Sequence, residues 1–361
     1  MQSVSQLKYS ESNTNNQVAL IQWRLLPHET SDAEGFARAV EERTAQVCSN
    51  RQVKLLVFPE LSGLWLQLSS LFGRPAAIDS YAISGSSVSG GLPGGAGVAG
   101  GLLTSKPGAV LRFLIGTGGR ALAGRKWAQQ LRQWLDPFCR AAEKYNVYIC
   151  PGSMFLPVFR YSPRGIPEAT HQRTANTSCL IGPNGKVLGF RRKLRLTALE
   201  KRLGLAGGDA TEDLLPYCTE LGRLGLAVCL DGFYEDIIAR LDMQGTEYVL
   251  QPSANSIDWS ALLKREGGRQ VRQSEEWLSC GIGSLIQGRE SILAAYNPMC
   301  VTRGYLFSHS GRSTAWVNCR RVDSQIEEGQ RAAPETGSYP GLIRIAENKY
   351  QEEHLYVGLP R

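Results

Sequence analysis

The sequence is poor in histidine and has no closely spaced pair of cysteines. Among its 361 residues are four histidines and nine cysteines, and none of the cysteines forms a C-x-x-C pair. This odd and dispersed set supports neither a disulfide framework nor a four-cysteine zinc site, and it favours a reducing, cytoplasmic setting. Residues 1–17 also lack the apolar run of a secretory signal, so we expect them to form a polar N-terminal tail.

A strong charge excess and a long hydrophobic run are missing as well. The 40 Lys and Arg exceed the 33 Asp and Glu by a net charge of +7, which is too small and dispersed to predict nucleic-acid binding. Residues 82–105 are uncharged and long enough to cross a bilayer, but Gly and Ser dominate them and Pro93 lies among them. We therefore expect no membrane partner. We expect a Gly-rich insert at about residues 84–124, as a solvated linker or as a lid over a site.

Apolar residues are present in the proportion that a globular chain needs. Hydrophobic residues make up 42% and charged residues 20% of the sequence, so the chain can bury a core. Apolar runs at Val18–Trp23 and Lys54–Phe58 predict buried strands, and apolar residues at helical spacing between them predict a helix. Ser31 and Glu34 have the spacing of a capping box, which predicts that this helix begins there.

Helices and strands continue to alternate downstream. Apolar residues at helical spacing from Trp127 to Leu135 predict a second helix, and Asp136 followed by Pro137 predicts that a third begins there. Further strands are predicted at residues 147–150, 177–181, 186–190, 224–229, 247–251, 292–296 and 314–318. The alternation predicts an α/β fold with a mixed sheet covered by helices.

The sequence predicts one large domain between two tails. Residues 18–320 contain no linker that would divide two cores, so we expect them to form a single domain that carries the Gly-rich insert. Residues 321–361 are polar. We expect them to form a C-terminal tail that lies on the surface or at a subunit interface.

Three of the predicted strands end near residues that could carry out catalysis. Glu60 follows LLVFP, Lys193 follows VLGFRR and Cys229 follows LGLAV. In one cleft, these side chains would supply a base, an electrostatic clamp and a nucleophile, which are the groups that acyl transfer through a thioester needs. Taken singly, each also has a structural interpretation: a surface turn for the glutamate, a solvated basic run for the lysine and an inert buried thiol for the cysteine.

Together, the three residues and their surroundings resemble the nitrilase superfamily of carbon-nitrogen hydrolases. Glu60 ends VFPE, Lys193 lies in FRRKLRLTALEK and Cys229 lies in GLAVCLDGFYED, in the order of the family's Glu-Lys-Cys triad. The strings YICPGS, NTSCLIGPNGKVLGF and FSHSGRSTAWVN extend the resemblance over about residues 18–320. The resemblance implies a four-layer αββα sandwich and a homo-oligomer, either a dimer or a larger assembly.

The resemblance also implies a mechanism. Glu60 would take the thiol proton, Cys229 would attack the carbonyl or nitrile carbon, and Lys193 would stabilise the charge that develops. Water activated by Glu60 would then release the acid, so no metal, nucleotide or organic cofactor is needed. Glu200 lies where nitrilases and aliphatic amidases place a second active-site glutamate, and it would orient the substrate and the lysine.

The residues that follow Cys229 bear on the substrate. Nitrile-hydrolysing members usually have Trp-Glu at this place, whereas this chain continues with Leu230, Asp231 and Gly232. The Asp-Gly pair and Tyr234 resemble aliphatic amidases, so we expect Asp231, Gly232 and Tyr234 to bind the substrate. Gly232 would also permit a tight turn after the cysteine.

Other features of the same region leave the substrate open between amide and nitrile. Glu235 and Asp236 replace the Pro-Glu that usually closes the amidase motif, and the K-L-x-x-T-x-x-E-x-x-L spacing from Lys193 is nitrilase-like. We expect a cysteine hydrolase that cleaves a small linear amide to a carboxylic acid and ammonia. The alternatives are a nitrilase, which forms the acid from a nitrile, and a non-catalytic interaction protein with the nitrilase fold.

Overall fold

The buried apolar runs of the sequence form the central strands of the protein. The computed structural model describes residues 7–9, 16–49, 52–72, 126–163, 166–265, 268–302, 308–324 and 339–360. Strands β2 (Gln17–Arg24) and β3 (Val53–Val57) cover the first two predicted runs, and helix α2 (Ala33–Cys48) connects them as expected. The Gly-rich insert expected at about residues 84–124 lies outside the described residues.

The other elements of the described ranges follow in chain order. The N-terminal half contains β1 (Leu7–Tyr9), α1 (Pro27–Thr30), α3 (Leu64–Phe72), α6 (Trp127–Tyr145), β4 (Tyr148–Cys150), β5 (Ser153–Tyr161), β6 (Pro167–Ile181) and β7 (Val187–Arg192). Next come α7 (Ala198–Arg202), β8 (Tyr217–Thr219), β9 (Gly222–Leu226), the 3-10 turn η1 (Cys229–Phe233), α8 (Glu235–Met243), β10 (Tyr248–Leu250) and β11 (Ser253–Ala254). The C-terminal part contains β12 (Leu262–Lys264), β13 (Gln270–Arg272), α9 (Gln273–Cys280), α10 (Ile282–Leu285), β14 (Ala294–Asn297), β15 (Met299–Val301), β16 (Thr314–Val317), β17 (Val322–Ser324), β18 (Leu342–Ile345) and β19 (Glu353–Gly358).

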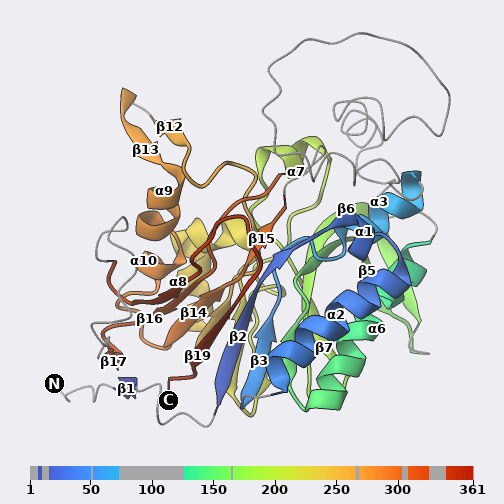
Figure 1. Cartoon of the computed structure of the whole chain (residues 1–361), viewed down its shortest axis with the longest axis horizontal. Helices are drawn as coiled ribbons and strands as arrows, with labels where there is room; N and C mark the ends of the chain where they lie inside the picture. Colours follow the sequence, from blue (N-terminus) through green and yellow to red (C-terminus); the bar gives the residue numbers. More distant parts are fainter. Residues whose placement is uncertain are drawn as a thin grey trace.

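Most of the strands belong to two sheets at the centre of the molecule (Figure 1). A nine-stranded sheet runs in the order β11-β15-β2-β3-β4-β6-β5, with β19 paired to β2 and β7 paired to β6. A six-stranded sheet has the order β18-β16-β14-β10-β9-β8. Both sheets mix parallel and antiparallel pairs, as the alternation of helices and hairpins predicts.

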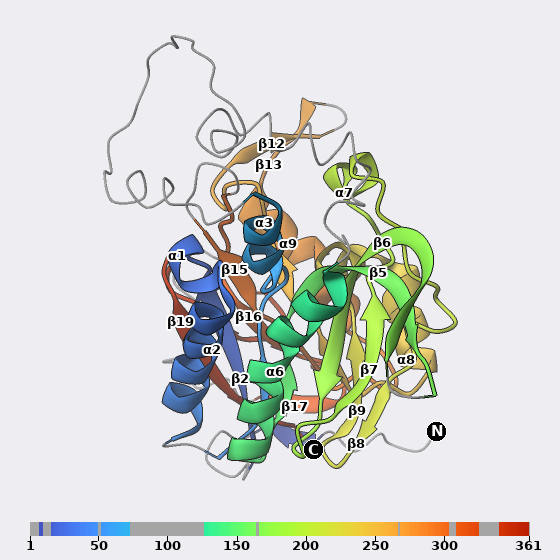
Figure 2. The same ribbon diagram turned by 90° about the vertical axis from the view of Figure 1, so that its right-hand side faces the viewer.

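Side chains of the central strands alternate between separate hydrophobic cores. On β2, Val18 and Leu20 join the core between the sheets, whereas Ala19 and Ile21 pack with α2 and α6. On β10 of the other sheet, Val249 packs with α8, α9 and α10. Because successive strand residues point to opposite faces, each sheet is buried on both sides. Figure 2 shows α2 and α6 together outside the nine-stranded sheet, which completes the predicted four-layer αββα arrangement.

Helix α2 begins differently from the prediction. Its N-cap is Asp32, whose carboxylate accepts a hydrogen bond from the Gly35 amide at 2.8 Å. The prediction of a capping box between Ser31 and Glu34 is therefore wrong. The Ser31 carbonyl accepts a hydrogen bond from the Ser69 hydroxyl. Serine and aspartate are similarly good N-caps, so the sequence alone favoured the wrong one of two neighbours.

The predicted break before Pro137 is also wrong, because α6 runs without interruption from Trp127 to Tyr145. Buried side chains recur at helical spacing on both sides of the proline, from Leu131 and Trp134 to Phe138 and Ala142. Packing of this continuous apolar face outweighs the loss of one backbone hydrogen bond at the proline.

The two segments expected to be tails contain strands. In the C-terminal segment, β18 pairs with β16, and β19 pairs with β2 over six residues. Leu355 and Val357 of β19 are buried in the core between the sheets. The prediction of a C-terminal tail at residues 321–361 is therefore corrected: its described residues complete both sheets. In the N-terminal segment, β1 pairs with β17, and β2 begins at Gln17.

Candidate active site

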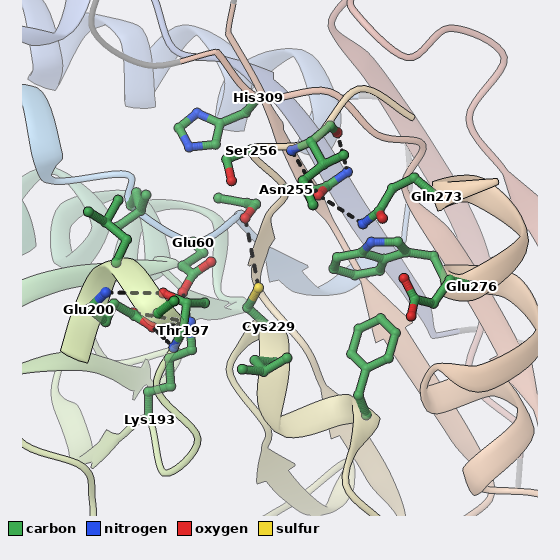
Figure 3. A pocket seen from close by; sticks show the side chains of 18 of the residues that line it. Glu60, Lys193, Thr197, Glu200, Cys229, Asn255, Ser256, Gln273, Glu276 and His309 are labelled. Atoms are coloured by element: carbon green, nitrogen blue, oxygen red, sulfur yellow. Dashed lines mark hydrogen bonds and ion pairs between the residues drawn. The ribbon is translucent and has the colours of Figure 1, made fainter. Parts of the chain in front are cut away.

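The three predicted catalytic residues line one cavity of about 1060 Å³ (Figure 3). Glu60 lies just beyond the end of β3, and Lys193 lies directly after β7, so both come from the nine-stranded sheet. Cys229 follows β9 of the six-stranded sheet. Helix α7 adds Glu200 to the wall. The cavity is thus built where strands of both sheets end, and the sequence correctly predicts which side chains meet there.

A buried ionic cluster forms one side of the cavity. The Lys193 ammonium group donates a hydrogen bond to Glu60 at 2.8 Å and lies 3.1 Å from the Glu200 carboxylate. Lys193 is 1% exposed and Glu60 is 3% exposed, so water screens these charges very little. A second oxygen of Glu200 accepts a hydrogen bond from the Thr197 amide, and this capping box fixes the start of α7. The lysine is therefore held in place by two carboxylates.

Asn176 of β6 joins the two carboxylates, although the sequence analysis did not single it out. Its side-chain amide donates to Glu60 at 2.8 Å and to Glu200 at 2.9 Å. The signal was present in the predicted hairpin, because β6 and β7 pair so that the Lys193 amide donates to the Asn176 carbonyl at 2.8 Å. A polar residue that lies opposite the lysine on the paired strand of such a hairpin is close enough to take part in the same site.

Cys229 stands at the tip of a tight turn and not at the end of a strand as expected. Strand β9 ends at Leu226, and Cys229 adopts a φ of 50°, in the left-handed region that residues other than glycine seldom occupy. Its amide donates to the Pro252 carbonyl at 3.0 Å, and its thiol lies 3.8 Å from the Ala254 carbonyl oxygen. These contacts hold the strained turn so that the thiol faces the cavity.

Asp231, which the sequence analysis expects to bind the substrate, lies outside the cavity lining. Its buried carboxylate accepts hydrogen bonds from the amides of Leu194 at 3.1 Å, Arg195 at 2.6 Å and Val228 at 3.1 Å. Burial raises the pKa of Asp231 to about 7, and these amide donors oppose the rise. Asp231 therefore ties the backbone that follows Lys193 to the turn that carries Cys229.

Gly232 also lies outside the cavity lining, and it is needed for a different reason from the one expected. A Cβ atom at this position would lie 2.1 Å from the Gln251 side-chain nitrogen. That nitrogen donates to the Cys229 carbonyl at 2.8 Å. Gly232 thus makes room for the side chain that supports the turn, while Cys229 itself takes the strained backbone conformation.

Tyr234 does line the cavity, at its more exposed side. The side chain is 39% exposed, and the Arg195 guanidinium group lies 4.6 Å from the centre of its ring. Leu230 and Phe233 of the same segment line the cavity too. The segment after Cys229 therefore contributes apolar and aromatic wall residues, and its Asp-Gly pair supports the turn from behind.

Burial and charge give the two glutamates different pKa values. Burial raises the pKa of Glu60 above its ordinary value, and the lysine offsets this only in part. Burial also acts to raise the pKa of Glu200, but Lys193, Asn176 and the Thr197 amide together bring it below its ordinary value. Glu200 is therefore the more firmly ionised carboxylate, and Glu60 is the one that gains a proton more readily.

The pKa values of Lys193 and Cys229 are both raised, but by different causes. Burial acts to lower the pKa of Lys193, but its charged neighbours, Glu60 above all, more than offset it and hold the pKa well above its ordinary value. Burial and then Glu60 raise the pKa of the Cys229 thiol far above its ordinary value. The lysine is therefore a permanent cation, and the thiol is protonated at rest.

The described residues contain no group of three or more His, Cys, Asp or Glu side chains arranged to hold a metal ion. No helix within the described ranges is long and apolar enough to cross a membrane.

Solved structures with the same arrangement define the class of fold. An amidase from Nesterenkonia sp. AN1, solved with the acetamide moiety of fluoroacetamide attached to its active-site cysteine, aligns with 98% of this chain and 92% of its own. That alignment has a TM-score of 0.57 and 13% sequence identity. A carbon-nitrogen hydrolase from Helicobacter pylori aligns over 95% of this chain and 89% of its own, with a TM-score of 0.54 and 15% identity. The fold is that of the nitrilase superfamily.

A match to a protein-family model shows the family to which the chain belongs. The carbon-nitrogen hydrolase family model matches residues 17–269, so the chain belongs to the carbon-nitrogen hydrolase family, as the resemblance implies. Nitrilase 2 of Arabidopsis thaliana is 26% identical over 195 residues, which are 54% of this chain and 48% of that protein. The match thus spans about half the length of this curated relative. Cyanide hydratase of Leptosphaeria maculans is 41% identical over 66 residues, 18% of each chain.

Proposed function

We propose that this protein hydrolyses an amide to a carboxylic acid and ammonia through a thioester on Cys229. One observation carries the proposal: the Cys229 thiol shares a cavity with a lysine and a glutamate that are 2.8 Å apart. The charge of Glu60 is also among the causes that raise the pKa of the Cys229 thiol, which supports the glutamate as the base that acts on this nucleophile.

In the first half of the reaction, Glu60 takes the thiol proton while the sulfur of Cys229 attacks the carbonyl carbon. The transfer accompanies the attack because the raised pKa of the thiol leaves little free thiolate. The raised pKa of Glu60 makes it a stronger base than an ordinary glutamate. When the carbon-nitrogen bond breaks, the same proton passes to the nitrogen, and ammonia leaves.

Lys193 stabilises the negative charge that develops on the carbonyl oxygen. Its raised pKa keeps it cationic throughout the reaction, and its two carboxylate partners hold its position before the substrate arrives. A fixed charge in a site shielded from water stabilises a transition state more strongly than an exposed one. Glu200 is the positioning residue for this lysine.

In the second half, water hydrolyses the thioester. Glu60 has returned its proton to the leaving ammonia, so it can accept a proton from the attacking water. The carbon-sulfur bond breaks, the carboxylic acid forms, and the thiolate of Cys229 recovers the proton from Glu60. Glu60 and Cys229 are thereby returned to the protonation states in which they began the reaction.

A nitrile substrate is the second candidate, because the match to nitrilase 2 covers 195 residues. Both reactions begin with attack by the same thiol. Matched pairs of substrates separate them: butyramide with butyronitrile, and phenylacetamide with phenylacetonitrile, each assayed for ammonia and for the acid. Faster release from the amides supports the proposal, and faster release from the nitriles replaces it with a nitrilase. No release from any of them would favour the non-catalytic alternative.

A further inference from the structure

The turn that carries Glu60 contains a second strained residue of the active site. Leu61 directly follows Glu60, lines the cavity and adopts a φ of 65°. A bulky residue seldom occupies this left-handed region, because its Cβ atom then lies too close to the following carbonyl oxygen. Among the described residues other than glycine, only Leu61, Asn146 and Cys229 have a positive φ. Asn146 ends helix α6, so the other two belong to the active site.

The turn between β4 and β5 holds the backbone of Leu61. The Leu61 amide donates a hydrogen bond to the Ser153 hydroxyl at 3.0 Å, and the Gly63 amide donates to the Ser153 carbonyl at 3.3 Å. Ser153 is the first residue of β5 and is fully buried. A strained backbone conformation persists only where its surroundings oppose relaxation. Ser153 supplies such an opposing contact at Leu61.

The same turn contacts the chain on both sides of Glu60. Gly152 has a φ of 84°, and a Cβ atom at this position would lie 1.9 Å from the Pro59 carbonyl oxygen. The Ser62 hydroxyl donates a hydrogen bond to the Pro151 carbonyl at 2.5 Å. The residues before and after Glu60 are therefore both packed against the β4–β5 turn.

This packing determines where the Glu60 carboxylate lies. The φ of Leu61 sets the direction of Glu60 relative to α3, which begins three residues further on at Leu64. Relaxation of Leu61 to a negative φ would therefore move the carboxylate away from Lys193, which it now meets at 2.8 Å. A displacement of about 1 Å at a catalytic group can lower a rate about 100-fold.

We propose that Ser153 is a positioning residue for the general base: its hydroxyl keeps Leu61 in the strained conformation that holds the Glu60 carboxylate beside Lys193. The inference rests on the proposed function, since it takes Glu60 as the base that accepts the thiol proton. It assigns a role to the YICPGS string, which the three catalytic residues leave unexplained. The role is indirect, because Ser153 lies outside the cavity lining.

Ser153→Ala removes the acceptor and leaves the charges of the site unchanged. In ammonia release from an amide, kcat should fall about 10- to 100-fold because the base is displaced. KM should change by less than about twofold, because no residue of the cavity wall is altered. Loss of kcat without a change in KM is what displacement of the base predicts.

The pH profile separates positioning from a merely structural role. Lys193, Glu200 and Cys229 act on the pKa of Glu60, and Lys193 is the strongest of the influences that lower it. A carboxylate displaced from Lys193 has a still higher pKa, so the acidic limb of kcat/KM should move to higher pH in Ser153→Ala. A loss of folded protein alone would leave this limb where it is in the wild type.

Ser178→Ala is the matched control. Ser178 is also fully buried and pairs with Ser153 between β6 and β5, but its hydroxyl contacts the Cys150 thiol. This variant should keep the kcat and the pH profile of the wild type. Ser153→Cys has a weaker acceptor of similar size, so it should show a smaller loss of the same kind. It replaces Ser153→Ala in the test if that variant does not fold.

Substitutions of Leu61 test whether strain is the cause. Glycine adopts a positive φ without strain, so the loss caused by Ser153→Ala should largely disappear in a Leu61→Gly background. Leu61→Ala removes the same side chain from the cavity wall but keeps a Cβ atom, so the loss should persist there. Equal losses in the two backgrounds would overturn the role assigned to the strained turn.

Alkylation of Cys229 by iodoacetamide follows the same proton transfer without turnover. The sulfur-carbon bond forms, iodide leaves and Glu60 takes the thiol proton, so Ser153→Ala should slow this reaction and shift its acidic limb to higher pH. Unchanged kcat, pH profile and alkylation in Ser153→Ala would overturn the inference. The proposed function fails differently, by the absence of ammonia release from the wild type, and alkylation then still decides the role of Ser153.

Discussion

The ammonium group of Lys193 lies 2.8 Å from the Glu60 carboxylate, and both side chains are almost completely buried. Removing one partner of such a pair leaves an uncompensated charge in the protein interior. Here the pair is part of a larger cluster, since Glu200 and Asn176 are hydrogen-bonded to it. We interpret the cluster as a preorganised site in which both carboxylates hold the lysine and Glu60 also accepts the proton of the Cys229 thiol.

The pH profile of kcat/KM should report the ionisation of Glu60. Its pKa is raised in the folded protein, and only the ionised form can accept the thiol proton, so activity should fall as pH decreases through a value above that of an ordinary glutamate. Ammonia release measured from about pH 4 to about pH 9 tests this expectation. Glu60→Gln should lower kcat/KM about 10²- to 10⁴-fold and abolish this acidic limb. An acidic limb that is unchanged in Glu60→Gln would assign it to another group.

Asn176→Leu should impair catalysis without displacing a substrate contact. The change removes the amide donor shared by Glu60 and Glu200, and the loss of one hydrogen bond to a charged group should lower kcat/KM about 10- to 100-fold. Asn176 also donates to the Glu60 carboxylate, and losing this donor favours the protonated form of Glu60, so the acidic limb should move to higher pH than in the wild type. Asn184→Leu, in the exposed turn between β6 and β7, is the control. Equal activities and pH profiles for the two variants would contradict the role assigned to Asn176.

Asp231→Asn should destabilise the fold more than it alters substrate binding. An amide in place of the carboxylate sets a donor against backbone amides that now donate to Asp231, which should cost about 1–3 kcal/mol of the free energy of unfolding. KM should change by less than about twofold, because Asp231 does not line the cavity. Denaturant unfolding and steady-state kinetics measure the two effects.

Asp236→Asn serves as the control for Asp231→Asn, since this exposed carboxylate pairs with Arg195 at the surface. Its effect on unfolding should be small. A large rise in KM for Asp231→Asn with unchanged stability would restore the direct role in substrate binding that the sequence predicts.

Gly232→Ala should disturb Cys229 through Gln251. The new methyl group would displace the side chain that donates to the Cys229 carbonyl, and overpacking of this kind costs about 1–3 kcal/mol. Gln251→Ala removes the obstacle, so adding Gly232→Ala to it should cost much less than in the wild type. The four proteins form a double-mutant cycle that is read by denaturant unfolding and kcat. Additive effects in this cycle would show that the glycine acts independently of Gln251.

The sequence predicts that Glu60, Lys193 and Cys229 lie in one cavity, because each of the three follows a strand whose apolar pattern is clear. Glu60 and Lys193 come from the ends of β3 and β7, and strand ends that meet at one edge bring their next residues together. Asn176 could have been found in the same way, from the pairing of β6 with β7 opposite Lys193.

The residues after Cys229 were predicted less well, because position next to a nucleophile does not say which way a side chain points. Asp231 and Gly232 face the protein interior, where their contacts come from residues far away in sequence, such as Arg195 and Gln251. The C-terminal strand β19 was missed although Leu355 and Val357 alternate with more polar residues, because the polar composition of the whole segment hid this short period-two pattern. Both errors concern contacts across the fold that local patterns do not encode.

The most direct test of the account is the mass of the protein during turnover. Intact-mass spectrometry of the wild type mixed with phenylacetamide, with ammonia release followed in parallel, should show an acyl adduct that maps to Cys229. Cys229→Ala should keep its fold by circular dichroism and lose both the adduct and ammonia release. Ammonia release that persists in Cys229→Ala, or an adduct that maps to another residue, would contradict the thioester mechanism.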